Sequence, residues 1–103
     1  MKFTFTDGWT LGDMSANIAE ADSYTLAEDE KKPFVNVAMS AASKALTLGL
    51  EVGEVMVVAN IGASNAVTVK CIDGDTGSSL AAGKVALCIG QAAANASKIY
   101  VLN

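Results

Sequence analysis

The chain has 103 residues with a formal net charge of −4, and it contains seven lysines but no arginine and no histidine. This length allows a single domain with a real core, and the acidic balance without clustered lysine argues against a nucleic-acid partner. No apolar run approaches the roughly 20 residues of a membrane-spanning helix, so we expect no membrane partner either. The opening residues lack the apolar centre of a signal peptide, which predicts synthesis in the cytoplasm.

The first 30 residues differ in composition from the rest and are expected to form an extended N-terminal arm. Phe3, Phe5 and Trp9 lie among turn-forming residues, where a folded monomer would have difficulty burying them. They are therefore candidate contacts to a partner. Residues 15–21 are expected to form one or two helical turns. An alternative is a first strand over 2–6, followed by a long loop of the same domain.

Residues 31–103 are expected to form the body, an all-β domain of the sandwich or barrel-like kind, with jelly-roll or immunoglobulin-like architecture. Short alternating stretches with β-branched residues follow one another at the spacing of such a domain. The predicted strands cover 34–39, 46–50, 54–61, 66–72, 84–89 and 98–102, after a short one at 23–27. The charged stretch 28–33 is expected to be a solvated loop.

The central feature of this body is a predicted hairpin made of strands 54–61 and 66–72. Residues 62–65, Gly-Ala-Ser-Asn, supply the small and turn-compatible residues that a hairpin connection needs.

Strands 54–61 and 84–89 are apolar on both faces, although a sandwich exposes one face of each sheet to water. A second cover is therefore expected, either the arm or another subunit. In strand 54–61 we expect Val55 and Val57 to face the core. Met56 and Val58 would then point outward and form an oligomer interface, most simply in a homotrimer.

Residue types suited to catalysis are scarce, and we expect no enzymatic activity, no cofactor and no metal. Without histidine the chain lacks the commonest general base and metal ligand, and no phosphate-binding glycine motif occurs. Cys71 and Cys88 are expected to be buried free thiols, with a disulfide as the alternative. The loop 73–78 (DGDTGS) has two carboxylates, too few for a calcium loop, and is expected to be a strand connection.

Several positions of the body resemble small virion proteins of tailed bacteriophages. Such proteins share a stretch in which glycine, valine, asparagine and glycine precede V-T-V (here G-x-x-x-x-V-x-N-x-G-x-x-x-x-V-T-V), then a strand with leucine, glycine and leucine (here L-x-x-G-x-x-x-L) and a last strand with an aromatic residue. The matching residues here are Gly53, Val58, Asn60, Gly62, Val67, Thr68, Val69, Leu80, Gly83, Leu87 and Tyr100. The resemblance covers about residues 35–103, and the N-terminal third has no counterpart in it.

Among these virion proteins, capsid decoration (cement) proteins have this size and build. The resemblance implies a structural protein on the capsid surface of a virion, with the major capsid protein as partner and often a trimeric state. Phe3, Phe5 and Trp9 would be the capsid contacts. A fibre or tail-spike module, or a small carbohydrate-binding domain, is the alternative function.

Overall fold

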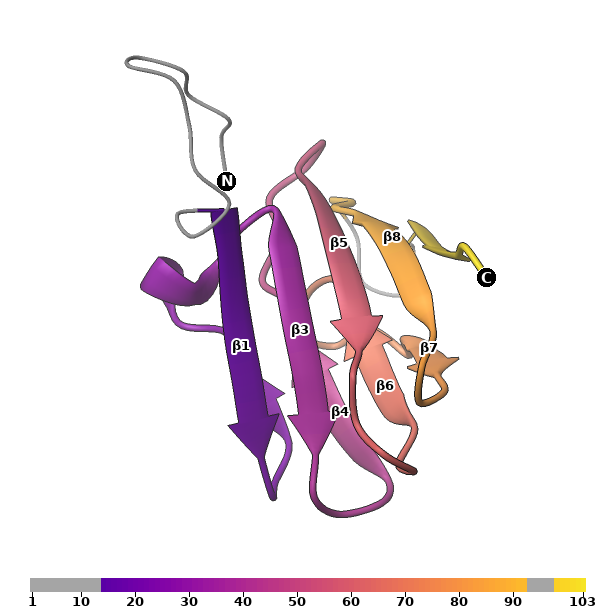
Figure 1. The fold of residues 1–103 in the computed structure, drawn as a ribbon. Coiled ribbons are helices and arrows are strands. Elements are labelled where there is room, and N and C mark those ends of the chain that lie inside the picture. Colours follow the sequence, from indigo (N-terminus) through magenta and orange to yellow (C-terminus); the bar gives the residue numbers. More distant parts are fainter. Residues whose placement is uncertain (1–13, 93–97) are drawn as a thin grey trace.

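Two stacked β-sheets make up the protein, as the computed structural model in Figure 1 shows for residues 14–92 and 98–103. The five-stranded sheet contains, in spatial order, β1 (Ser15–Glu20), β3 (Phe34–Met39), β5 (Val55–Asn60), β8 (Val85–Ile89) and β9 (Lys98–Val101). The four-stranded sheet contains β2 (Tyr24–Thr25), β4 (Lys44–Thr47), β6 (Val67–Lys70) and β7 (Ser78–Leu80). A short 3-10 helix, η2 (Glu28–Glu30), follows β2. The all-β sandwich expected from the sequence is confirmed.

Successive strands from β1 to β6 alternate between the two sheets, so strands that follow one another in this part of the sequence do not pair. The chain places β1, β3 and β5 side by side in one sheet and β2, β4 and β6 side by side in the other, and all of these neighbours are parallel. Only the last part is antiparallel, where β7 pairs with β6, β8 with β5 and β9 with β8. This winding differs from the antiparallel Greek-key connections of jelly rolls and immunoglobulin domains.

The predicted central hairpin is wrong. β5 lies between β3 and β8 in the five-stranded sheet, whereas β6 belongs to the four-stranded sheet. Residues 61–66 therefore carry the chain from one sheet to the other. Period-2 alternation and small turn residues suit a tight hairpin and a corner between sheets equally well, so they do not decide between them.

The N-terminal boundary of the body also differs from the prediction. Residues 15–20 form strand β1, not helical turns, because Ile18 is buried and the whole strand pairs in parallel with β3. Strand β1 belongs to the five-stranded sheet and β2 to the four-stranded sheet. The body therefore begins near residue 14 and not at 31. The predicted arm contacts Phe3, Phe5 and Trp9, and the alternative strand over 2–6, lie outside the described residues.

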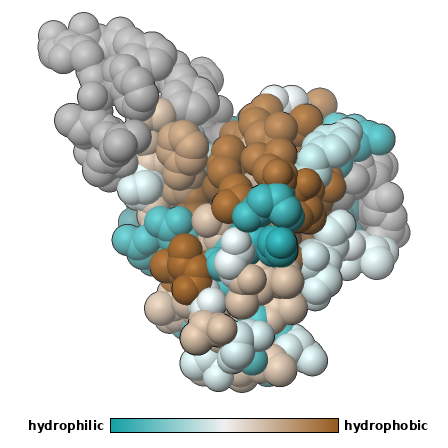
Figure 2. Space-filling model, turned by 45° about the vertical axis from the view of Figure 1, so that its right-hand side comes forward, coloured by the Kyte–Doolittle hydropathy of each residue, from teal (hydrophilic) through white to brown (hydrophobic). Residues whose placement is uncertain are grey.

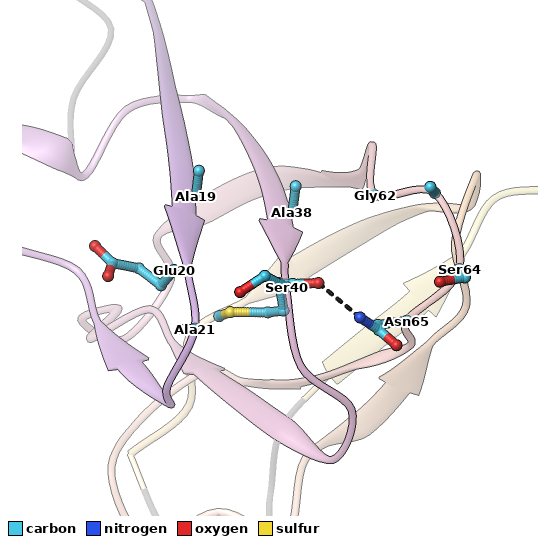
Figure 3. A pocket seen from close by; sticks show the side chains of 10 residues that line it. Ala19, Glu20, Ala21, Ala38, Ser40, Gly62, Ser64 and Asn65 are labelled. Atoms are coloured by element: carbon cyan, nitrogen blue, oxygen red, sulfur yellow. Dashed lines mark hydrogen bonds between the residues drawn. The ribbon is translucent and has the colours of Figure 1, made fainter.

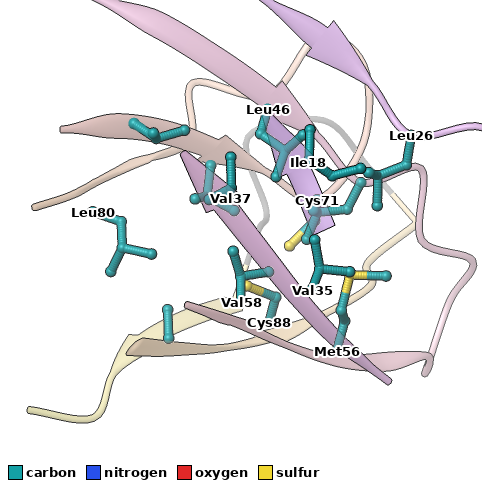
Figure 4. Close-up of a cluster of buried hydrophobic side chains, with 14 of the residues drawn as sticks. Ile18, Leu26, Val35, Val37, Leu46, Met56, Val58, Cys71, Leu80 and Cys88 are labelled. Atoms are coloured by element: carbon teal, nitrogen blue, oxygen red, sulfur yellow. The ribbon is translucent and has the colours of Figure 1, made fainter. Parts of the chain in front are cut away.

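The core is a single layer of side chains between the sheets (Figure 4). Valine, leucine and isoleucine dominate it, and methionine and cysteine fill the remaining space. Its fully buried members include Val35, Val37, Leu46, Leu48, Met56, Val58, Val67, Val69, Cys71 and Cys88. Because both sheets contribute, the two layers cannot separate without exposing this apolar surface to water.

One polar residue, Asn60, occupies a core-facing position at the end of β5, in register with Val37 of β3. Its Nδ2 donates hydrogen bonds to the carbonyl oxygens of Asn65 and Leu80, both at 2.9 Å, and its Oδ1 accepts one from the Gly62 N–H at 3.0 Å. A buried amide with these partners is satisfied. Asn60 thus fixes the path of the chain as it leaves β5 for the other sheet.

Candidate docking surface

The two strands that are apolar on both faces, β5 and β8, are neighbours in the five-stranded sheet. The sequence indicated both strands, but the faces of β5 are the reverse of the prediction. Met56 and Val58 have no exposed surface and pack in the core, whereas Val55 is 40% exposed and Val57 is half-buried. Met56 and Val58 therefore cannot form an oligomer interface, and the outward-facing apolar residues of β5 are Val55 and Val57.

The strand register extends this outward face across the sheet. Phe34 of β3 pairs with Val57, Val57 pairs with Leu87 of β8, and Leu87 pairs with Tyr100 of β9. Side chains in register on one face of neighbouring strands contact one another. A continuous row of large side chains therefore crosses four strands.

A second, shorter row lies beside the first, where Val55 pairs with Ile89 and Ile89 pairs with Lys98. We call the six residues Phe34, Val55, Val57, Leu87, Ile89 and Tyr100 the outer apolar patch. Phe34 is 39% exposed and Tyr100 50% exposed, and Val57, Leu87 and Ile89 are half-buried. Figure 2 shows apolar side chains gathered over this part of the molecule. A contiguous exposed apolar area on a small protein is typical of an interaction site.

The other half of the same face is polar or built from small residues. Asn36 Nδ2 donates a hydrogen bond to Asn17 Oδ1 at 3.0 Å across β3 and β1. Beyond them lies an open hollow of about 640 Å³ at the ends of β1 and β3 (Figure 3). Its lining is mostly small, with Glu20 as its carboxylate, and Asn65 Nδ2 donates to the Met39 carbonyl oxygen on one side. It contains no aromatic ring on which a sugar could stack.

The outer face of the four-stranded sheet is polar, in contrast. Thr68 of β6 pairs with Ala45 of β4 on one side and with Ser79 of β7 on the other. Thr47 pairs with Lys70 in the next row. Thr47 is buried, but Ser79 is exposed and Thr68 and Lys70 are partly exposed, so water can hydrate them and this face needs no second cover.

The loop 73–78 has the structural role that the sequence indicated. Asp75 is buried, and its Oδ2 accepts a hydrogen bond from the Ile72 N–H at 3.3 Å. Gly74 and Gly77 have positive φ angles, 89° and 77°, which residues with a side chain rarely adopt.

Among the described residues, no three histidine, cysteine, aspartate or glutamate side chains cluster as a metal site would require. In the same residues no helix is long and apolar enough to cross a membrane.

Comparison with known proteins adds no relative: no family model, no curated protein and no solved structure matches the chain. The outer apolar patch is therefore the feature on which a functional proposal can be built.

Proposed function

We propose that the chain is a structural virion protein, a capsid decoration protein that binds the outer surface of an assembled phage head and stabilises it. The observation that carries the proposal is the outer apolar patch. Its six residues are aliphatic or aromatic, with Lys98 at their border, and the patch lies on a small acidic sandwich. A surface of this kind serves association, which is the main task of a decoration protein, and the sequence pattern resembles such proteins.

A second copy of the chain is the partner that we assign to the patch. The patch is broad and runs across strands β3 to β9, so an equally broad apolar surface is needed to cover it. Another copy supplies such a surface at the high local concentration that a virion gives. The resemblance implies a homotrimer, and burial of the patch would supply its main stabilisation.

Attachment to the shell is assigned to residues 1–13, through Phe3, Phe5 and Trp9. Large aromatic side chains contribute most of the energy of a small interface when a partner buries them. Several weak attachments per oligomer add up through avidity. Because the protein would bind the assembled shell and not its dissociated subunits, it would stabilise the shell by mass action.

The test is cosedimentation with expanded shells of the phage whose genome carries the gene. The intact protein should coat the shells and raise their melting temperature. Deletion of residues 1–13 leaves every described strand of both sheets in place, so the truncated protein should fold and remain in the supernatant. Trp9→Ala should weaken attachment while the thermal stability of the free protein stays the same.

Two results would contradict the proposal. If the truncated protein coats shells at full occupancy, residues 1–13 are not the attachment device. If the intact protein does not bind shells but sediments with host cell envelopes, a fibre or tail-spike module is the better function.

The carbohydrate-binding alternative has one supporting observation, because the exposed rings of Phe34 and Tyr100 lie in one row. Two residues, Val57 and Leu87, separate the rings, and specific binding to a glycan array would favour this alternative.

A further inference from the structure

The two cysteines of the chain come from different sheets and meet inside the core. Cys71 follows β6 of the four-stranded sheet, and Cys88 belongs to β8 of the five-stranded sheet. Both side chains are fully buried in the same cluster. The thiol of Cys88 is hydrogen-bonded to that of Cys71, and Figure 4 shows both sulfur-bearing side chains between the sheets.

We propose that Cys71 and Cys88 form a latent disulfide between the two sheets, which closes when the protein meets an oxidising environment. Two thiols in hydrogen-bond contact are direct neighbours, and a disulfide forms when their sulfur atoms approach to about 2.05 Å. A bond at this place would join layers that are otherwise held together by core packing and by the hydrogen bond from Asn60 of β5 to Leu80 of β7. Sandwich domains of the immunoglobulin type use a disulfide between sheets in the same structural role.

The surroundings of the pair define when the bond can form. The hydrogen bond with Cys71 and burial of the side chain both raise the pKa of Cys88, so the reactive thiolate is scarce in the folded protein. The reaction therefore takes place during folding or when the sandwich opens transiently. The disulfide, once formed, would also be shielded from reducing thiols, so it would be a stable structural bond and not a rapidly reversible one.

A small disulfide such as oxidised glutathione can serve as the oxidant for the two thiols. One cysteine thiolate attacks glutathione disulfide, which gives a mixed disulfide and releases one glutathione thiolate. The second cysteine thiolate then displaces the second glutathione. The two cysteines are oxidised, one glutathione disulfide is reduced, and the two protons from the cysteines end on the two glutathione thiols.

The experiment refolds the intact protein in a buffer of oxidised and reduced glutathione and compares it with protein refolded in dithiothreitol. The expected product is a chain with no disulfide to another chain, which has lost two hydrogen atoms in its intact mass and shows no free thiol after denaturation. The bond closes a short loop around β7, so the melting temperature should rise by roughly 10–20 °C relative to the reduced protein. Addition of dithiothreitol after unfolding should reverse the change.

Cys88→Ala and Cys71→Ala are the matched controls, because neither can close the bond, and glutathione should not raise their melting temperature. If either variant fails to fold, the comparison of oxidised and reduced wild-type protein still decides. The proposal is overturned if the wild-type protein keeps two free thiols under these conditions, forms only disulfides between chains, or melts at a lower temperature when oxidised. None of these outcomes depends on binding to a capsid, so the proposed function is tested separately.

Discussion

The outer faces of the two sheets differ in polarity. The face of the four-stranded sheet carries threonine, serine and lysine side chains around Thr68. The face of the five-stranded sheet carries the outer apolar patch on neighbouring strands. Both sheets contribute apolar side chains to the same core, so the core does not account for the difference. The contrast is the basis of our proposal that the first face meets solvent and the second meets a partner.

The largest expected effect separates the two sides of β5. Val58→Asp places a carboxylate in the core, where it has no partner, and should unfold the protein, because burial of an unpaired charge costs at least several kcal/mol. Val57→Asp, one residue earlier, places the same group on the outer face and should leave a folded chain. Circular dichroism and thermal melts of both variants provide the measurement. A folded Val58→Asp variant would mean that the faces of β5 are assigned wrongly.

A smaller effect is expected from the buried amide of Asn60. Asn60→Val removes the partner of two carbonyl groups and one N–H group and should lower the free energy of unfolding by about 2–4 kcal/mol. Asn36→Val is the control on the outer face, where the lost hydrogen bond to Asn17 is exposed. We expect that variant to change the free energy by no more than about 0.5 kcal/mol in chemical denaturation. Equal losses in both variants would contradict the structural role of Asn60.

The smallest effect concerns the edge of the polar sheet. The hydrogen bond from the Tyr24 hydroxyl to Glu30 Oε1 (2.6 Å), together with burial and the charge of Glu30, raises the pKa of Tyr24 to about 12. The unfolded chain has a tyrosine pKa near 10, so the folded state binds this proton more tightly. The resulting stabilisation is complete below about pH 10 and is lost as the pH rises toward 12.

Absorbance of the phenolate during a pH titration measures this property. Glu30→Gln should move the Tyr24 midpoint toward lower pH, and Tyr24→Phe should remove the late transition. An unchanged midpoint in the Glu30→Gln variant would show that the hydrogen bond does not set the pKa.

Local patterns in the sequence predicted the class of fold and most strands, but not how the strands combine. Residues 34–39 alternate and residues 84–89 are apolar on both faces, and β3 and β8 lie where these stretches predicted strands. The partners of β5 and β6 could not be read in this way, because pairing depends on contacts between distant residues. Strand β1 was missed for the same reason, since a short amphipathic segment becomes a strand only beside β3.

The candidate site was predicted in part. The sequence showed that β5 and β8 have two apolar faces and that such strands require a second cover. It could not show which face is outside, because Met56 and Val58 are as apolar as Val55 and Val57. The polar Asn60, which shares a face with Met56 and Val58, adds to the ambiguity, since a polar residue usually marks the solvent side. Its burial is explained only by the carbonyl groups that surround it in the folded chain.

The central claim, that the outer apolar patch is covered by a second copy of the chain, is tested most directly by the molar mass in solution. Light scattering coupled to size-exclusion chromatography should show an oligomer for the wild-type protein and a folded monomer for Val55→Lys, since an unpaired lysine in the interface weakens association about 100-fold or more. Ser79→Lys adds the same charge to the outer face of the other sheet and should leave the oligomer intact. A wild-type protein that remains a monomer at high concentration, or a Val55→Lys variant that associates like the wild type, would contradict the claim.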